Sequence, residues 1–206
     1  EEKYYGPKIY KLPKIWNSHC GFDLKRNYND LPVKKNGYFT FGSFNNFMKI
    51  NEEVLDVWVS ILKKIKRSKL ILKSSLYLCE EVIIKKFASE GLANSVQILK
   101  KTKRNDFSSH INSYDKIDMC LDPFPFNGVT TTIEALWKNV PVLTKTGYNF
   151  NSRCGESILK NAKIDNLIAR NNEDYINKAV FYANNIDKLE DVRKKLFKEI
   201  DKSTLF

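Results

Sequence analysis

Short apolar segments alternate with amphipathic segments along most of this chain, and the alternation restricts its fold more than any other feature. Strand-like segments are expected at residues 37–44, 69–73, 95–99, 118–122, 140–144 and 166–169. Between them, apolar residues recur at helical spacing within 51–66, 78–92, 108–117, 130–137 and 152–162, and two further helices close the chain. Strands joined by helices run parallel. The sequence therefore predicts an α/β fold, with a parallel sheet of about six strands and helices on both faces.

The first long helix has a start signal and a buried face. Asn51 is a typical N-cap, and Glu52 and Glu53 suit the positive end of a helix dipole. The apolar stripe of this helix comprises Val54, Trp58, Ile61, Leu62 and Ile65. A similar stripe in the last helix comprises Leu189, Val192, Leu196 and Ile200. Both stripes predict helices that cover a sheet.

Residues 1–36 lack such periodicity and contain three prolines, Pro7, Pro13 and Pro32. We expect them to form an extended lead-in or inter-domain segment that packs on another part of the protein. One domain then follows from residue 37 to 206. Because the chain does not begin with Met, we expect an excised piece of a longer protein. It has no apolar run of membrane-spanning length.

The composition favours an ordinary cytoplasmic protein without metal. The formal net charge is +11, but the lysines are spread over helix faces among acids and apolar residues, so a specific nucleic-acid site is not indicated. The four cysteines form no CxxC pair and indicate a reducing compartment. The two histidines, His19 and His110, have no nearby set of partners that completes a metal site.

Ligands of open parallel sheets bind beyond the carboxyl ends of the strands, and this rule selects the loops after the first, third and fourth predicted strands. Lys49 lies in the first of these, just before a helix N-terminus, where an ammonium and helix N–H groups can share a phosphate. His110 follows the third strand. Taken alone, Lys49 is an ordinary surface lysine and His110 an ordinary polar residue.

The loop after the fourth strand reads LDPFPFNGVTTTIEALW, from Leu121 to Trp137. Asn127 and Gly128 predict a tight turn in which the missing side chain lets a ligand approach the backbone. The threonines at the following helix start, which offer hydroxyls and N–H groups to an anion, are Thr130, Thr131 and Thr132. Glu134 lies one turn further on, within reach of ribose hydroxyls. Each residue also has a structural explanation, as a helix cap or a first-turn acid. Their convergence favours a nucleotide-diphosphate site, without a P-loop or a GxGxxG motif.

Three stretches, GYFTFGSFNNFMKI, DMCLDPFPFNGVTTTIEALWKNVPVLTKTG and SRCGESIL, resemble the C-terminal catalytic half of the O-linked N-acetylglucosamine transferase family, in particular its bacterial members. The resemblance covers nearly the whole chain. It implies one Rossmann-like half of a GT-B fold, with the active site in the cleft between two halves. It also implies an N-terminal catalytic half that this chain lacks, and it allows for tetratricopeptide repeats in the parent.

The resemblance assigns roles to the residues already selected. Lys49 corresponds to the lysine that neutralises the diphosphate and aids departure of UDP. The matching substrate-binding positions are His110, Thr130, Thr131 and Glu134, in addition to the Asn127–Gly128 turn and Thr132. Asn46 is also expected to bind substrate, at a position that the family often fills with glutamine. Val129 and Phe107 depart from the family, because relatives carry a histidine and a basic residue there.

The resemblance implies transfer of a sugar from UDP, such as UDP-N-acetylglucosamine, to a protein or peptide hydroxyl. No metal is needed if a lysine and helix N–H groups take up the negative charge of the leaving phosphate. Two alternatives stay open. In the first, the chain is a non-catalytic nucleotide-binding or interaction module. In the second, it is a basic nucleic-acid-binding domain. The isolated piece is expected to bind UDP weakly and to transfer little sugar.

Overall fold

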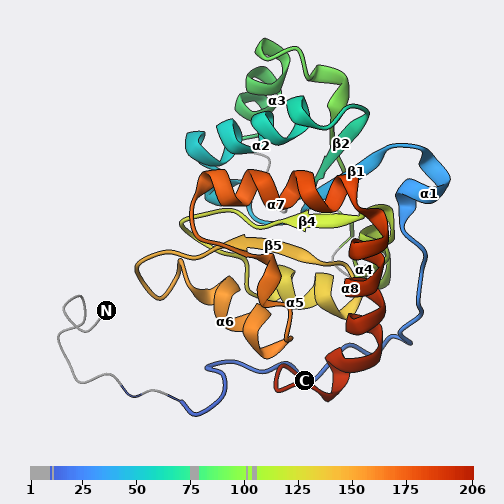
Figure 1. The fold of residues 1–206 in the computed structure, drawn as a ribbon, viewed down its shortest axis with the longest axis vertical. Helices are drawn as coiled ribbons and strands as arrows, with labels where there is room; N and C mark the ends of the chain where they lie inside the picture. Colours follow the sequence, from blue (N-terminus) through green and yellow to red (C-terminus); the bar gives the residue numbers. More distant parts are fainter. Residues whose placement is uncertain (1–9, 11, 75–78, 101, 104–105) are drawn as a thin grey trace.

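The fold is a single parallel sheet covered by helices on both faces (Figure 1). The computed structural model describes residues 10, 12–74, 79–100, 102–103 and 106–206. The expected lead-in at residues 1–9 and 11 and the start of the predicted second helix at Leu78 lie outside this range. The strands are β1 (Phe39–Ser43), β2 (Ser68–Leu72), β3 (Val96–Ile98), β4 (Met119–Leu121), β5 (Val142–Lys145) and β6 (Ile168–Ala169). They lie in the order β3-β2-β1-β4-β5-β6, and every pair is parallel.

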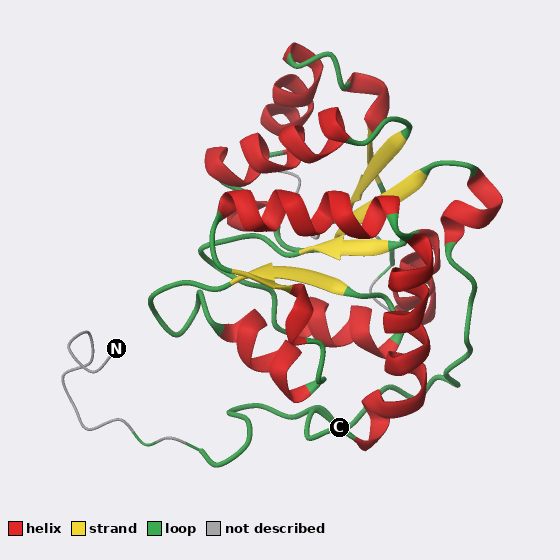
Figure 2. Cartoon of the chain, viewed as in Figure 1, coloured by secondary structure: helices red, strands yellow, loops and turns green. Residues whose placement is uncertain are grey.

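The helices connect these strands in the predicted sequence. They are α1 (Pro32–Asn36), α2 (Glu52–Lys64), α3 (Glu80–Ser89), α4 (Phe107–Asn112), α5 (Thr130–Trp137), α6 (Cys154–Asn161), α7 (Asn172–Asn184) and α8 (Ile186–Glu199). Helix α2 contacts α3 and α7, and α5 contacts α6 and α8. Figure 2 shows α2, α3 and α7 on one side of the strands and α5 and α6 on the other, with α8 running past the end of the sheet to contact both α7 and α5. The six-strand α/β prediction is thus confirmed. Among the described residues, no helix is both long and apolar enough to cross a membrane.

The predicted start and inner face of the first long helix are confirmed. The Asn51 side chain accepts a hydrogen bond from the Val54 N–H at 2.9 Å and caps α2. Its whole predicted stripe is buried, with Trp58 at 0% exposure. The stripe of α8 is buried as well. Burying a side chain of this size contributes about 1.5–3 kcal/mol, so these stripes hold both helices on the sheet.

The expected lead-in packs on this domain itself over the part described from His19 onward. The Arg26 guanidinium donates to the Asn139 side chain at 2.6 Å and to two backbone oxygens, and Leu31 is only 1% exposed. Residues 32–36 form helix α1, which the sequence analysis did not predict. Pro32 stands at its start, where its missing N–H is not needed, and Gly37 ends it with φ of 72°. The expectation that residues 19–36 pack elsewhere is therefore wrong.

Asp118 ties α1 and β1 to the start of β4. One of its carboxylate oxygens accepts the Val33 N–H at 3.0 Å, and the other accepts the Thr40 N–H at 2.8 Å. The side chain is fully buried, and burial raises its pKa to about 6, against the opposing influence of these two donors and of the nearby Arg193. Asp118 is thus a buried link between segments far apart in the sequence.

Replacing Asp118 with asparagine is expected to lower the free energy of unfolding by about 2 kcal/mol at pH 7.5, because the amide accepts only one of the two N–H groups. Urea unfolding followed by circular dichroism measures the change. Asp56→Asn is the matched control, because this exposed acid pairs with Lys86 on the surface and with no other residue of the described ranges. The control should cost less than about 0.5 kcal/mol. Equal costs for the two variants would contradict the role of Asp118.

Candidate functional site

The predicted site residues gather where the strand order changes direction. From β1 the chain proceeds outward through β2 to β3, and β4 then returns to the other side of β1. The loops that leave the carboxyl ends of β1 and β4 therefore diverge and create a crevice for a ligand. Lys49 follows β1, the three threonines and Glu134 follow β4, and His110 belongs to α4. The sequence selected this edge without knowledge of the strand order.

Lys49 links the loop after β1 to the loop after β4. It ends a 3-10 helix, Phe47–Lys49, and its ammonium donates to the Asn127 carbonyl at 2.9 Å. The same ammonium lies 4.3 Å from the centre of the Phe126 ring. Burial lowers the Lys49 pKa, while the nearby Asp122 carboxylate acts to raise it. A half-buried ammonium of this kind is held in place and is only partly shielded by water.

The threonines occupy the first turn of α5 but do not cap it. The N-cap is Val129, and no side chain caps the helix there. Thr130 is exposed, the Thr131 hydroxyl donates to the Asn45 side chain at 2.9 Å, and Thr132 is buried. The helix start thus presents N–H groups without a side-chain acceptor among the described residues. Such an end favours an anion, since N–H groups and the helix dipole act together.

Glu134 and His110 form a direct pair. The His110 Nε2 lies 3.1 Å from Glu134 Oε2, and the Tyr114 hydroxyl donates to the same oxygen at 2.9 Å. Tyr114 also donates to the Thr131 carbonyl at 3.2 Å, which ties this pair to the first turn of α5. The other Glu134 carboxylate oxygen has no hydrogen-bond partner in the described part of the chain. The geometry leaves one acceptor for a ligand hydroxyl.

The sequence analysis expected the missing side chain of Gly128 to let a ligand approach the backbone, and this explanation is wrong. A Cβ atom at residue 128 would lie 2.6 Å from the Thr131 hydroxyl oxygen and 2.9 Å from side-chain oxygens of both Asn45 and Asp122. Protein oxygens already fill the space that was expected to admit a ligand. The Gly128 N–H is also occupied, because it donates to Asp122 at 2.6 Å. Glycine is required here for the packing of the site's own polar groups.

The two asparagines named from the sequence brace the loops. Asn127 is fully buried, and its amide donates to the Pro123 and Lys145 carbonyls while its oxygen accepts the Gly155 N–H. Asn46 accepts the Met48 N–H at 3.0 Å and caps the 3-10 helix that carries Lys49. Both side chains thus hold backbone segments in position.

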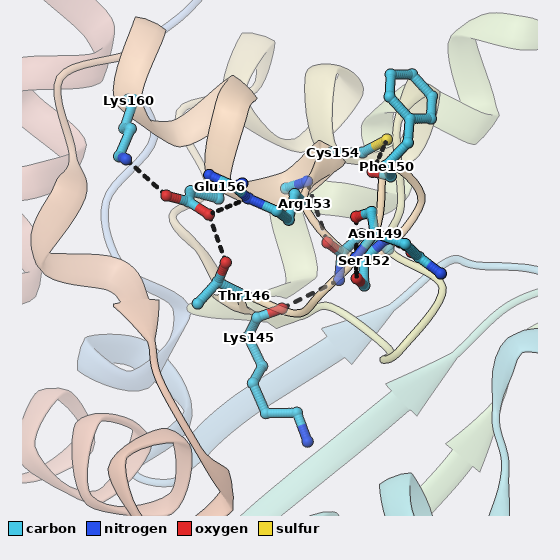
Figure 3. A network of polar contacts seen from close by, with 11 residues as sticks. Lys145, Thr146, Asn149, Phe150, Ser152, Arg153, Cys154, Glu156 and Lys160 are labelled. Atoms are coloured by element: carbon cyan, nitrogen blue, oxygen red, sulfur yellow. Dashed lines mark hydrogen bonds and ion pairs between the residues drawn. The ribbon is translucent and has the colours of Figure 1, made fainter. Parts of the chain in front are cut away.

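The loop after β5 is held by its own polar network (Figure 3). Ser152 and Asn149 exchange three hydrogen bonds of 3.0 Å each. Glu156 accepts from Lys160, Thr146 and Arg153. Burial acts to raise the Glu156 pKa, but these three donors outweigh it and lower the pKa to about 2. The SRCGESIL stretch therefore fixes the loop that borders the crevice.

Sequence reasoning missed three charged residues at this edge, Asp122, Lys73 and Lys145. Asp122 is 1% exposed, accepts from Gly128 and from the Thr144 hydroxyl at 2.7 Å, and has its pKa raised to about 7 by burial. Lys73 is 4% exposed, and burial lowers its pKa. Each residue lies at or directly after the end of an apolar strand, and this position is the signal that could have found them.

The crevice is open. The enclosed space beneath the Thr131 region is only about 10 Å³. A larger hollow of about 630 Å³ lies beside it, bordered by Phe124, Lys145, Tyr148 and Arg170 among others. Among the described residues, no group of three or more histidine, cysteine or acidic side chains is arranged to hold a metal ion. A ligand would lie across the edge of the sheet.

Known proteins resemble the whole of this domain. Residues 25–206 match the model of glycosyl transferase family 41. A tomato (Solanum lycopersicum) relative, described as a probable UDP-N-acetylglucosamine–peptide N-acetylglucosaminyltransferase SPINDLY, is 36% identical over 84% of this chain and 19% of its own length. A Caenorhabditis elegans UDP-N-acetylglucosamine–peptide N-acetylglucosaminyltransferase is 31% identical over 81% of this chain and 14% of its own length. The chain spans about a fifth or less of these relatives.

Solved structures agree. A K341M mutant of Thermobaculum terrenum O-GlcNAc transferase matches with a TM-score of 0.73 and 30% identity, over 84% of this chain and 34% of its own. The C-terminal domain of a Francisella tularensis group 1 glycosyl transferase matches with a TM-score of 0.64 at 11% identity, over 86% and 93% of the two chains, which shows a shared fold alone. The sequence resemblance is confirmed: this chain belongs to glycosyl transferase family 41, as the C-terminal catalytic portion.

Proposed function

We propose that this domain is the donor-binding half of a glycosyltransferase that moves a sugar from UDP to a protein or peptide hydroxyl. The observation that carries the proposal is the convergence of Lys49, the uncapped start of α5 and Glu134 on one edge of the sheet. The relatives' names supply the donor, UDP-N-acetylglucosamine, and the peptide acceptor. A cytoplasmic location remains a prediction from the cysteines.

The proposed chemistry needs charge stabilisation more than acid or base groups on this half. As the sugar leaves, negative charge grows on the UDP phosphate. In this proposal the Lys49 ammonium and the first N–H groups of α5 hold that charge, and the exposed Thr130 hydroxyl adds a donor. Glu134 would accept from the ribose, with His110 and Tyr114 fixing its carboxylate. In this proposal no metal takes part, and the parent's N-terminal half supplies the acceptor side.

The proposal predicts that different residues bind the ribose and the diphosphate of UDP. Glu134→Gln is expected to weaken UDP binding about fivefold and leave inorganic pyrophosphate binding unchanged, because it alters a single charged hydrogen bond to ribose. Thr131→Val is expected to weaken both ligands, because it acts at the phosphate end. NMR titration of the isolated chain measures these affinities.

A matched control is Glu199→Gln, an exposed acid at the end of α8. This variant should bind UDP and pyrophosphate as the unchanged chain does. Equal losses of UDP and pyrophosphate binding in Glu134→Gln would contradict the ribose role. UDP shifts that are the same in the unchanged chain, Glu134→Gln and Thr131→Val would contradict the site as a whole.

A further inference from the structure

A second hollow lies near the amino ends of the strands, away from the proposed donor site at their carboxyl ends. It measures about 590 Å³ and is bordered by α1 on one side and by the 3-10 helix Ser113–Lys116 on the other. Residues of three neighbouring strands, Thr40, Lys69, Ile71 and Gln97, line it between them. An adjoining hollow of about 380 Å³ shares Asn36, Tyr38 and Lys69 and extends to Arg67, Asn94 and Ser95. Together they form one depression, the amino-edge groove.

The amino-edge groove carries excess positive charge. The cations that line it and form no ion pair with other described residues are Lys35, Arg67, Lys69 and Lys116. Two further charges are already neutralised, because Lys34 pairs with Glu190 at 2.7 Å and Asp115 pairs with Lys138 at 2.9 Å. Asp30 is the one lining acid without an ion pair to the described part of the chain. A negatively charged partner is therefore complementary to this surface.

The groove also contains unsatisfied hydrogen-bonding groups. Thr40 is 1% exposed, and its hydroxyl has no hydrogen-bond partner among the residues that the structure describes. Buried hydroxyls are normally paired, so an unpaired one at a groove indicates a missing polar neighbour. In addition, β3 is the edge strand of the described sheet, so its outer backbone groups pair with no strand. An exposed strand edge is a template for another extended segment.

We propose that the amino-edge groove binds an acidic polypeptide segment in an extended conformation. Carboxylates of the segment pair with Lys35, Lys69 and Lys116 as the segment crosses β1 and β2 toward β3. Nucleic acid fits less well, because the Lys69 ammonium covers one face of the Tyr38 ring at 4.5 Å and so competes with a base for stacking there.

This groove is separate from the proposed donor site. Helix α1 lies at the amino ends of the strands, whereas the loop after β5 lies at the carboxyl ends (Figure 1). The residues of the donor crevice follow the carboxyl ends of β1 and β4. An acidic segment can therefore be held while UDP is bound at the other edge. The groove suits recruitment of a substrate or partner, and it does not depend on the donor assignment.

The test measures binding of a fluorescein-labelled peptide of ten glutamates by fluorescence anisotropy, with a ten-glutamine peptide and a ten-nucleotide dT strand for comparison. The combined variant Lys35→Gln, Lys69→Gln, Lys116→Gln is expected to bind the acidic peptide about tenfold more weakly, since exposed ion pairs each contribute a few-fold. The control is the combined variant Lys163→Gln, Lys198→Gln, Lys202→Gln, which removes the same charge from exposed positions elsewhere. It should lose less than about twofold.

Two further measurements, NMR shifts on adding the peptide and the response to UDP, locate the interaction on the protein. The peptide should shift the amide signals of Tyr38, Thr40 and Gln97, and both combined variants should keep the unchanged chain's response to UDP. Equal losses in the two combined variants would overturn the proposal, because diffuse attraction to net charge would explain the binding. Tighter binding of the dT strand, lost in the groove variant, would overturn it in favour of nucleic acid.

Discussion

Lys49→Ala, in the parent protein that carries both catalytic halves, is expected to lower kcat by about 10²- to 10³-fold while the KM for the UDP-sugar changes by less than about fivefold. We expect kcat to fall more than KM rises because the extra negative charge on the departing phosphate appears only late in the reaction. A ground-state diphosphate is already bound by several donors, whereas the extra negative charge of the departing phosphate exists only in the transition state. An ammonium placed for that charge stabilises the transition state more than the bound substrate.

Because of the position of Lys49, we expect another cation to replace it only in part. Its ammonium is fixed between the Asn127 carbonyl and the Phe126 ring, and burial already lowers its pKa. Lys49→Arg keeps the charge but moves it outward on a longer, planar group, so activity should return only in part. Steady-state kinetics with varied donor concentration measure both constants.

Lys64→Ala is the matched control, because this lysine is exposed at the end of α2 and lies in no ion pair with the described residues. Its kinetic constants should equal those of the unchanged parent. A Lys49→Ala protein with normal kcat and a raised KM would show that the lysine only binds the donor. That result would remove the leaving-group role and leave the UDP site standing.

The fold was predictable because its strands are short segments rich in apolar residues and its long helices carry one apolar stripe. These patterns set the element order and placed the carboxyl ends of the strands correctly. They did not set the strand order, since a parallel sheet built of these units can be assembled in several sequences. Nor did they predict α1, a helix of five residues with little periodicity to detect. Its place depends on long-range bonds from Asp118.

The site was predictable only to the level of which residues meet. Strand-end position brought Lys49, Thr131, Glu134 and His110 to one edge. Whether a polar group faces a ligand or another part of the chain depends on tertiary contacts that no local pattern contains. Asn127 illustrates this limit: an Asn-Gly pair predicts a turn, but its amide is occupied by the Gly155 N–H and two carbonyls.

Gly155→Ala is expected to lower the free energy of unfolding by about 3 kcal/mol, near the upper end of the usual cost of overpacking. The Cβ atom of an alanine at residue 155 would lie 2.2 Å from the Thr144 hydroxyl oxygen and 2.8 Å from an Asp122 carboxylate oxygen. Both atoms belong to the 2.7 Å hydrogen bond that holds the buried Asp122 carboxylate. The added methyl group must therefore displace either β5 or the start of α6.

The double variant Gly155→Ala, Thr144→Ala separates this clash from general damage to the helix. Thr144→Ala alone should cost about 1–2 kcal/mol, because Asp122 loses a donor. With the hydroxyl gone, the shortest contact disappears while those to the Asp122 oxygen at 2.8 Å and the Thr144 Cβ at 2.9 Å remain, so the double variant should be about 1 kcal/mol more stable than the sum of the single costs implies. Urea unfolding measures all three variants. Additive costs would contradict the clash.

The same substitution should also affect the proposed donor site. Gly155 donates its N–H to the Asn127 side chain at 3.2 Å, and the Asn127 carbonyl accepts from Lys49. A shift of α6 therefore moves the carbonyl that positions the ammonium. Gly155→Ala is expected to weaken UDP binding about threefold at a temperature where the variant is still folded, since small displacements weaken charged hydrogen bonds. Partial recovery in the double variant would link the packing of the SRCGESIL stretch to the position of Lys49, whereas unchanged binding in Gly155→Ala would separate them.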